Sequence, residues 1–492
     1  MSTSLKHWLL VVLVLLLIVV VLYFVPNQSI SKGIETTTYV PVTPVEAVQI
    51  SKPKIEPLPL NLSEVEPQII LTLAGSNTIG AKLAPAIASH YLKRLGAVGT
   101  LVKTLDKENE VQVVGFLPDK NRVVAIEIKA HGSSTGFKSL LAKDTDIAMS
   151  SRGIKEQENL ELLLEMGDMT KAESEHIIAL DGLAVIVHSA NAVKKLTVGQ
   201  IAKIFSGQIT NWSELGGLDQ AIKLHARDDQ SGTFDTFNSL VLKKFGLKLA
   251  QSTRYESNEN LAEAVGTDEA AIGFTGLAYA KAEMIMKVAA AEGLPAILPK
   301  QFSISSEDYA LSRRLFLYAN KKRSDNPHVA QFIELAVSID GQNLVELVDF
   351  IPQRITATLP LVDGNFPLKY QEIAATGNRL SMTFRMRSDR AEIDNKSAQD
   401  IEHLVNYLSA VSHDKVTLVG FSAGESNDEE ADKNRAYIRS RLLAYELKQR
   451  GVDNIEIIAL GSQLPIDSNG NEIGRYKNNR TEVWIIKSDE TI

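Results

Sequence analysis

Three segments between residues 70 and 240 repeat one arrangement: a strand-like apolar run, a turn that combines Gly with Ser or Thr, and a helical pattern. The turns occupy residues 75–80, 132–136 and 227–233. Short apolar runs that alternate with helical patterns are typical of α/β folds. The same texture extends over residues 69–352, so this stretch is predicted to be an α/β region.

The three turns have the chemistry of an anion site. The first turn of a helix exposes unpaired N–H groups at the positive end of its dipole, and glycine lets an anion approach the backbone closely. Arg227 adds a fork of charged donors that suits a tetrahedral oxyanion. A single turn of this kind is more often only an N-cap, and an Arg beside two Asp residues is usually a solvated ion-pair cluster, so the anion site is inferred from the three turns together. None of the turns has the spacing of a nucleotide or dinucleotide motif, so an anion site without nucleotide machinery is predicted.

The N-terminus predicts export. Lys6 precedes an unbroken apolar run, Trp8–Val25, which ends at Pro26. Eighteen helical residues span about 27 Å, close to the thickness of a bilayer core. The charge at Lys6 favours a cytoplasmic N-terminus, with everything after Pro26 outside. An uncleaved anchor is the favoured interpretation, while cleavage near Ser29–Ser31 and a buried core helix are the alternatives.

Composition shifts predict five parts along the chain. They are an anchor (residues 1–25), a proline-rich linker (26–67), the α/β region (68–355), a short linker (356–375) and a C-terminal unit (376–488). Seven prolines and the absence of a helical or strand period predict a stiff first linker, which could extend on the order of 130 Å. The C-terminal unit shows a strand, helix, strand, helix, strand pattern.

Charge and residue usage exclude several functional classes. The net charge of −8 is mild for 492 residues, which argues against a nucleic-acid partner. The chain has no cysteine, so disulfides and thiolate metal sites are excluded. The nine histidines show no H-x-x-x-H or H-x-H spacing, and no G-x-S-x-G motif is present. We therefore expect a protein that is not an enzyme and that needs no metal or other cofactor.

The α/β region resembles the phosphate-binding (PstS-like) proteins of bacterial ABC importers. The resemblance is carried, in order, by residues 75–78, 146–152, 196–212, 227–233, 271–274 and 341–352. It implies a two-lobed periplasmic binding protein fold with a ligand held between the lobes. The ligand residues it implies are Ser76, Thr78, Ser134, Ser151, Arg227, Ser231, Gly232 and Thr233, with Arg152 adding positive charge nearby. Asp229 is expected to orient Arg227.

Ser151 departs from the pattern of this family. Well-known members have an aspartate at this position, which accepts the proton of hydrogen phosphate and repels fully deprotonated sulfate. Serine lacks that repulsion, because its hydroxyl donates as well as accepts. Phosphate is the preferred ligand, another small oxyanion is the alternative, and discrimination against sulfate is expected to be looser than in relatives with the aspartate.

The C-terminal unit resembles the OmpA-like peptidoglycan-binding domain, a small βαβαβ unit. The matching residues are 416–421, 435–436, 451–452, 459–461, Pro465 and 474–480. The resemblance implies binding to the diaminopimelate of peptidoglycan, with Arg435 binding its carboxylate. Ala423 stands where the family has an aspartate for the ammonium group. Glu425 or Asp428 could substitute for it, and a retained fold with little wall binding is the alternative.

These features predict a single-pass protein of the inner membrane with most of its chain in the periplasm. Its first candidate function is to capture phosphate and pass it to an ABC importer or a sensor. The second is an envelope scaffold that links the inner membrane to the cell wall and uses the anion-binding fold for sensing. The long linker favours a tethered protein, and the 227–233 cluster favours ligand binding.

Overall fold

The computed structural model describes residues 65–319, 325–360, 362, 365–385, 394–424 and 428–486. Within these ranges, no helix combines the length and apolarity that crossing a bilayer requires. The predicted anchor Trp8–Val25 and nearly all of the predicted proline-rich linker lie outside the described residues. The described chain consists of a large domain, up to residue 355, and a C-terminal module, from residue 356 onward.

One mixed ten-stranded sheet runs through the large domain, in the order β2-β3-β4-β1-β5-β13-β6-β10-β8-β9. Its strands are β1 (Gln68–Gly75), β2 (Val98–Thr104), β3 (Glu110–Leu117), β4 (Arg122–Lys129), β5 (Ile147–Ser150), β6 (Glu175–Val187), β8 (Lys223–Arg227), β9 (Thr253–Tyr255), β10 (Ala271–Gly276) and β13 (Ser312–Tyr318). A separate three-stranded sheet consists of β7 (Lys195–Thr197), β11 (Lys287–Ala289) and β12 (Ala296–Ile297). β1 pairs in parallel with β4 and β5, and β8 with β9 and β10, as α/β architecture requires.

Two separate hydrophobic cores divide the large domain into two lobes. The helices of lobe 1 are α2 (Asn77–Gly80), α3 (Leu83–Arg94), α4 (Ser133–Leu141), α5 (Glu156–Met166), α10 (Pro327–Val337) and α11 (Ile339–Leu347). Those of lobe 2 are α6 (Val198–Phe205), α7 (Gly232–Phe237), α8 (Asn258–Gly266) and α9 (Gln301–Ser305). Shorter helical turns lie at Pro118–Lys120, Trp212–Leu215, Asn238–Leu242, Lys243–Phe245, Leu277–Tyr279 and Ala282–Met284. The expectation of two α/β lobes is confirmed.

Helix α6 illustrates how the sequence specifies these elements. The Thr197 hydroxyl accepts from the Gln200 backbone N–H at 3.1 Å, and the Gln200 side chain accepts from the Thr197 N–H at 2.8 Å. This reciprocal capping box satisfies two donors at the helix start. Ile201, Ile204 and Phe205 follow at helical spacing and are fully buried in the core of lobe 2.

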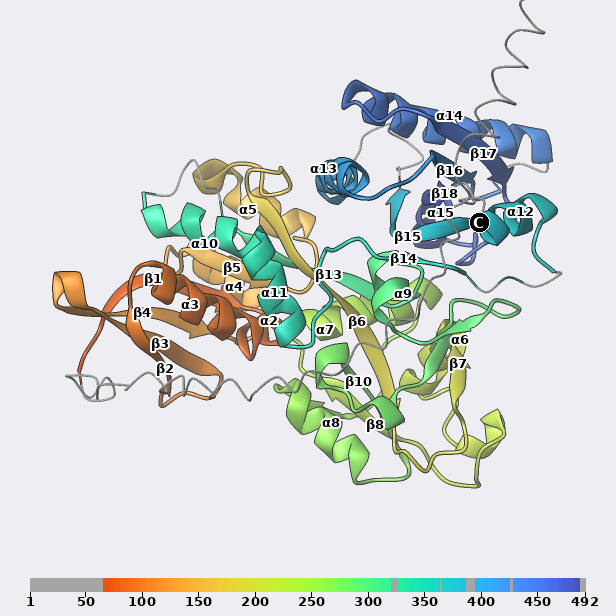
Figure 1. Cartoon of the computed structure of the whole chain (residues 1–492). Helices are drawn as coiled ribbons and strands as arrows, with labels where there is room; N and C mark the ends of the chain where they lie inside the picture. Colours follow the sequence, from red (N-terminus) through yellow and green to blue (C-terminus); the bar gives the residue numbers. More distant parts are fainter. Residues whose placement is uncertain are drawn as a thin grey trace, which may run out of the picture. The chain divides into compact units, whose positions relative to one another are not determined.

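Strands β6 and β13 belong to both lobes. They pair with each other antiparallel, with a register shift between Leu315 and Phe316. Ile178 of β6 packs in the core of lobe 1, whereas Leu183, Val185 and Val187 pack in the core of lobe 2. Figure 1 shows β6 and β13 side by side in the middle of the large domain. These two strands therefore connect the two lobes, and we call them the hinge strands.

The C-terminal module contains a five-stranded sheet in the order β14-β15-β18-β16-β17. Its strands are β14 (Ala357–Thr358), β15 (Gly377–Arg385), β16 (Lys415–Phe421), β17 (Ile455–Gly461) and β18 (Arg480–Ile486). Its helices are α12 (Leu368–Thr376), α13 (Asn395–Ala410), α14 (Glu429–Gln449) and α15 (Glu472–Asn478). The predicted strand and helix alternation is present as β15-α13-β16-α14-β17, with β14, α12, α15 and β18 as additions.

The two faces of this sheet differ in chemistry because side chains alternate along each strand. Leu380, Met382 and Phe384 of β15 pack in one apolar core with residues of α13 and α14. The alternate positions Arg379 and Arg385 are also buried, but they face the other side together with charged residues of β18. A charged face that is buried requires partners, and the large domain supplies some of them.

Residues 356–375 differ from the short linker expected from the sequence. β14 pairs with β15, and α12 places Tyr370 and Ile373 against Trp484 in a small apolar core. Prolines that punctuate this stretch, such as Pro360 and Pro367, stand between these elements, which is compatible with an edge of the sheet. This segment is therefore part of the module.

A stacked aromatic pair should make a large contribution to the stability of lobe 2. The rings of Phe237 and Phe274 lie 3.8 Å apart at their centroids, and both side chains are fully buried. Phe274→Ala removes one ring and leaves a cavity, so we expect the free energy of unfolding to fall by about 3–5 kcal/mol. Urea unfolding of the full chain, followed by tryptophan fluorescence, measures this. Leu164→Ala, at a side chain that is 91% exposed, should change the value by less than about 0.5 kcal/mol, and equal effects of the two variants would contradict the assignment.

Candidate oxyanion-binding site

The three predicted turns converge where the lobes face each other. The turns that precede α2 and α4 belong to lobe 1, and the turn that precedes α7 belongs to lobe 2. The hydroxyl oxygens of Thr78 and Thr233 lie 3.0 Å apart across the lobes. A Cβ added at Gly232 would lie 2.0 Å from the Ser133 hydroxyl oxygen and 2.5 Å from that of Ser151. Only glycine at position 232 leaves room for these two hydroxyls, so the five residues form one compact hydroxyl cluster.

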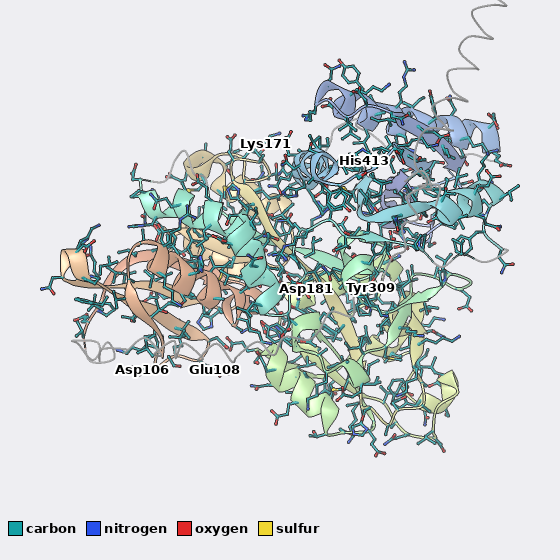
Figure 2. All side chains as sticks on the ribbon, viewed as in Figure 1. Asp106, Glu108, Lys171, Asp181, Tyr309 and His413 are labelled. Carbon is teal, nitrogen blue, oxygen red and sulfur yellow. The ribbon has the colours of Figure 1, made fainter. Side chains whose placement is uncertain are left out.

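A buried arginine that the sequence interpretation missed lies at this cluster. Arg313 of β13 donates to the Thr233 hydroxyl at 2.8 Å and to the Thr78 hydroxyl at 3.3 Å. Its Nε and Nη2 also donate to Asp181 of β6, at 2.9 and 2.6 Å. Figure 2 labels Asp181 at the middle of the large domain. The hinge strands thus deliver a fixed guanidinium to a point between the lobes.

Arg227 takes a different position from the one expected. Its guanidinium donates to the Tyr255 carbonyl at 3.2 Å, to the Glu256 carbonyl, and to the Asn258 side chain at 2.6 Å. Asn258 in turn donates to Asn77 of lobe 1 at 3.2 Å. Burial lowers the pKa of Arg227 to about 10, which leaves the group charged near neutral pH. Arg227 therefore lies behind the hydroxyl cluster, where its charge and its link through Asn258 support the site.

The expectation that Asp229 orients Arg227 is wrong. Asp229 is largely exposed and pairs with Arg254 at 2.7 Å. The acceptors that orient Arg227 are carbonyls and an amide from the segment 255–258, which follows β9. These contacts are remote in sequence, so a local motif could not reveal them.

The serines of the predicted shell have distinct positions. Ser133, which is fully buried, accepts from the Ser151 backbone N–H at 3.1 Å, whereas Ser134 points to Arg152 and accepts from it at 3.0 Å. The structure therefore places Ser133 in the cluster instead of Ser134. Ser231 caps α7 and accepts from the Thr233 and Phe234 N–H groups at 3.1 and 3.3 Å. Ser76 is buried immediately before α2, where its N–H donates to Met149 at 2.9 Å.

Arg152 joins the lobes instead of leaving a free positive charge in the cleft. It pairs with Glu158 of lobe 1 at 2.6 Å and with Asp235 of α7 in lobe 2 at 2.8 Å. Burial alone would lower the pKa of Arg152, but these two carboxylates raise it above its ordinary value. Lys155 also pairs with Asp235, at 2.8 Å. The expected positive charge is therefore neutralised by two carboxylates.

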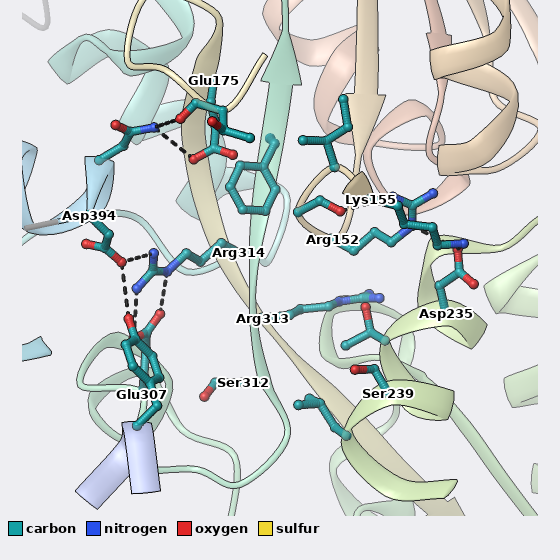
Figure 3. Close-up of a pocket in the computed structure, with 18 of the residues that line it drawn as sticks. Arg152, Lys155, Glu175, Asp235, Ser239, Glu307, Ser312, Arg313, Arg314 and Asp394 are labelled. Carbon is teal, nitrogen blue, oxygen red and sulfur yellow. Dashed lines mark hydrogen bonds and ion pairs between the residues drawn. The ribbon is translucent and has the colours of Figure 1, made fainter. Parts of the chain in front are cut away.

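A cleft of about 1080 Å³ lies beside this cluster. Lobe 1, lobe 2, strand β13 and the C-terminal module all contribute to its walls, and Figure 3 labels ten of the side chains. Arg313 belongs both to the hydroxyl cluster and to the wall of this cleft. The hydroxyls, held by the Arg313 guanidinium, and the helix-start N–H groups are donors of the kind that a tetrahedral anion would require.

The fold and this site define a class, the two-lobed periplasmic binding proteins. A family model described as a PBP superfamily domain matches residues 110–339. The phosphate-binding protein PstS of Borreliella burgdorferi is 30% identical over 238 residues, which cover 47% of this chain and 81% of that protein. The protein SphX of Synechocystis sp. is 29% identical over 240 residues, which cover 46% of this chain and 70% of that protein.

A solved structure gives a similar comparison. A phosphate ABC transporter substrate-binding protein from Clostridium perfringens, solved with bound phosphate, is 28% identical with a TM-score of 0.45, and the match covers 57% of this chain and 98% of that one. From its sequence relatives, this chain belongs to the PstS family of phosphate-binding proteins. The family consists of binding proteins, which confirms the expectation that the chain is not an enzyme.

Gly132 should be required for the contact between the lobes. Its backbone has a φ of +110°, and an added Cβ would lie 2.0 Å from the Gln230 carbonyl of lobe 2. Gly132→Ala should therefore separate the turns and weaken inorganic phosphate binding by about tenfold or more. Calorimetric titration of the full chain measures this. Gly153→Ala, where an added Cβ meets nothing within 4 Å, is the matched control, and equal affinities of the two variants would contradict this geometry.

Proposed function

We propose that this chain is a membrane-tethered periplasmic protein that captures phosphate, or a related small oxyanion, between its two lobes. The observation that carries the proposal is the convergence of Thr78, Thr233 and Arg313 at the junction of the lobes. Thr78 and Thr233 come from different lobes, so a ligand held by both would close the cleft. The names of the curated relatives support phosphate as the first ligand to test.

The hydrogen-bond chemistry of the cluster favours an anion. A hydroxyl has one proton to donate and two lone pairs that accept. Thr78 and Thr233 both accept from Arg313, and one of them donates its proton to the other. An oxyanion between them would give both protons a charged acceptor, and charge-assisted bonds are about twice as strong as neutral ones. Arg313 would then hold the hydroxyls with their protons directed to the ligand.

The carboxylate in contact with this cluster is not available to a ligand proton. Asp181 is held by two bonds from Arg313 and also accepts from the Gly182 and Leu277 N–H groups at 2.8 and 3.2 Å. Position 151, where well-known relatives have an aspartate, presents a hydroxyl. A fully deprotonated oxyanion therefore meets no unpaired carboxylate from Asp181 or position 151, which favours looser selection between phosphate and sulfate.

Direct titration tests the proposed ligand. We expect inorganic phosphate to release or absorb heat on mixing with the full chain and to raise its melting temperature, because a ligand that binds only the folded state stabilises it. Sulfate should give a smaller effect of the same kind. The absence of both heat and a thermal shift with either anion would overturn the proposal.

Ser151→Asp should restore discrimination against sulfate. The added carboxylate can accept the proton of hydrogen phosphate, whereas sulfate at neutral pH leaves it unpaired and facing a like charge. We expect the phosphate-to-sulfate affinity ratio to rise by about tenfold or more. Competition titrations of the two anions measure the ratio. Ser409→Asp, exposed on α13 of the module, adds the same charge elsewhere and should leave the ratio unchanged; a parallel change in both variants would contradict the role of position 151.

The tether and the destination of the ligand are further parts of this proposal. The apolar run Trp8–Val25 supports a single-pass inner-membrane anchor, and the prolines of residues 26–67 support a long, extended linker in the periplasm. A tethered binding protein would present phosphate to an ABC importer or a sensor in the same membrane.

A second candidate is an envelope scaffold whose OmpA-like module docks to peptidoglycan. Arg435 of α14 bonds to the buried carboxylate of Asp432, and its side chain keeps about a third of its surface exposed. The Ala423 N–H donates to Asn479 at 2.9 Å, Asp428 caps α14, and Glu425 lies outside the described residues. A fixed, partly exposed guanidinium supports carboxylate binding.

Arg435→Ala tests the scaffold candidate. If Arg435 grips the carboxylate of diaminopimelate, its loss should lower retention of the full chain on purified sacculi by about tenfold or more, since a charge-assisted bond is removed. Arg441→Ala, at an exposed position of the same helix, is the matched control. Equal retention of the wild type and both variants would remove Arg435 from any wall site.

A further inference from the structure

An acidic turn of the large domain is inserted into the charged face of the C-terminal module. The acidic turn consists of residues 306–308, between α9 and β13. Asp308 pairs with Arg379 of β15 at 2.8 Å, and Glu307 pairs with Arg385 of β15 at 2.8 Å. Arg385 also donates to the Ser306 carbonyl at 3.0 Å. We call Arg379 and Arg385, with Arg480 of β18, the arginine face.

The acidic turn and the arginine face are built as a complementary pair. Glu307 has a φ of +56°, a left-handed conformation that is uncommon outside glycine and that orients two successive carboxylates toward the module. Burial alone would raise the pKa of Glu307, but Arg314 and Arg385 hold it well below its ordinary range. Arg385 is 2% exposed. Buried charges on one side that meet opposite charges on the other are the mark of a specific interface.

The module contacts both lobes, not one. Asn395 of α13 donates to the Thr170 carbonyl at 2.9 Å and to Glu175 at 3.0 Å, both of which belong to the lobe 1 side of β6. On the lobe 2 side, Lys244 pairs with Asp467 of the module at 2.5 Å, and both side chains are buried. Figure 3 shows the Glu175 contact above the Arg314 contacts on the same wall of the cleft. Any change of angle between the lobes must therefore alter contacts of the module.

Strand β13 links this interface to the hydroxyl cluster. Consecutive residues of a strand point to opposite faces. Arg313 donates to the hydroxyls of Thr78 and Thr233. Arg314 pairs at 2.7 Å with Glu307 of the acidic turn and, also at 2.7 Å, with Asp394 of the module. Two neighbouring side chains of β13 thus end in the two sites. Figure 3 shows Arg313 and Arg314 on opposite sides of the strand.

We propose that docking of the C-terminal module on the acidic turn is coupled to closure of the lobes around the oxyanion. The proposal rests on the proposed function, because it needs a ligand that closes the lobes. The large domain and the module belong to one compact unit, as such coupling requires. Coupling between two sites is reciprocal: if docking strengthens ligand binding by some factor, the ligand must strengthen docking by the same factor. The module is then an internal partner whose contacts report whether the site is occupied.

Hydrogen exchange of the full chain tests the coupling, with inorganic phosphate as the probe. We expect saturating phosphate to slow exchange in the site turns, residues 132–136 and 231–234. Coupling predicts slower exchange in the module as well, at residues 379–385 and 464–478. Protection of the site turns without any change in the module would overturn the coupling and leave the proposed function standing. No protection in either region would overturn both.

Charge-removing variants test the reverse direction. The double variant Glu307→Gln with Asp308→Asn and, from the other side, Arg385→Met should both loosen the module and weaken phosphate binding by about fivefold or more. Glu334→Gln, at an exposed carboxylate of α10 outside the interface, is the matched control and should bind phosphate as the wild type does. Circular dichroism identifies any variant that fails to fold, and two independent interface variants guard against that outcome. Wild-type affinity in both folded interface variants would overturn the coupling, since linkage requires an effect in each direction.

Discussion

The buried ion pair between Arg313 and Asp181 is the interaction on which the large domain depends most. Taking two charges out of water costs several kcal/mol per ion, and their attraction offsets this only when the remaining hydrogen-bonding groups are satisfied. Here Asp181 also accepts from two backbone N–H groups, and Arg313 donates to hydroxyls of both lobes. The partners come from both strands of the hinge and from both lobes. The pair is fully satisfied only when the lobes are in contact, so its energetics favour the same arrangement that forms the candidate anion site.

In this arrangement the charged group, the Arg313 guanidinium, is not the group that the cluster presents to a ligand. The guanidinium of Arg313 is neutralised by Asp181, so the cluster presents oriented hydroxyls and backbone N–H groups instead of an exposed cation. In the proposed function, such a site would bind through fixed dipoles and donors, which suit an anion that leaves its hydration shell on closure. Arg227, held behind the cluster by carbonyls of residues 255–256 and by Asn258, adds positive potential without direct exposure. In the proposed function, selectivity between oxyanions would depend on which groups can accept a ligand proton, and position 151 would be central to that selectivity.

The sequence was informative where the determinants are local. Glycines and hydroxyl residues between a strand and a helix predict the three turns, because cap chemistry and positive φ are properties of a few consecutive residues. Arg313 was not predicted, since its partner Asp181 lies 132 residues away and no turn motif surrounds it. A signal existed nonetheless: Arg313 and Arg314 interrupt an otherwise apolar strand, where charges require buried partners. The sequence prediction named Ser134 where the structure has Ser133. Successive side chains of a helix point about 100° apart, so an error of one residue at a helix start changes which side chain faces the cluster.

The module shows why alternation along a strand carries more information than composition. Residues 379–385 read as a polar stretch mixed with apolar residues, but their period of two separates an apolar face from an arginine face. A sheet with a buried charged face cannot be satisfied by its own helices alone, so part of its partner set must come from elsewhere in the chain. The acidic turn at residues 306–308 supplies these partners, and Arg313 of the candidate anion site follows five residues after Asp308. The chain has no cysteine, so ion pairs such as these connect the large domain and the module without covalent cross-links, and unlike cross-links they can break and re-form.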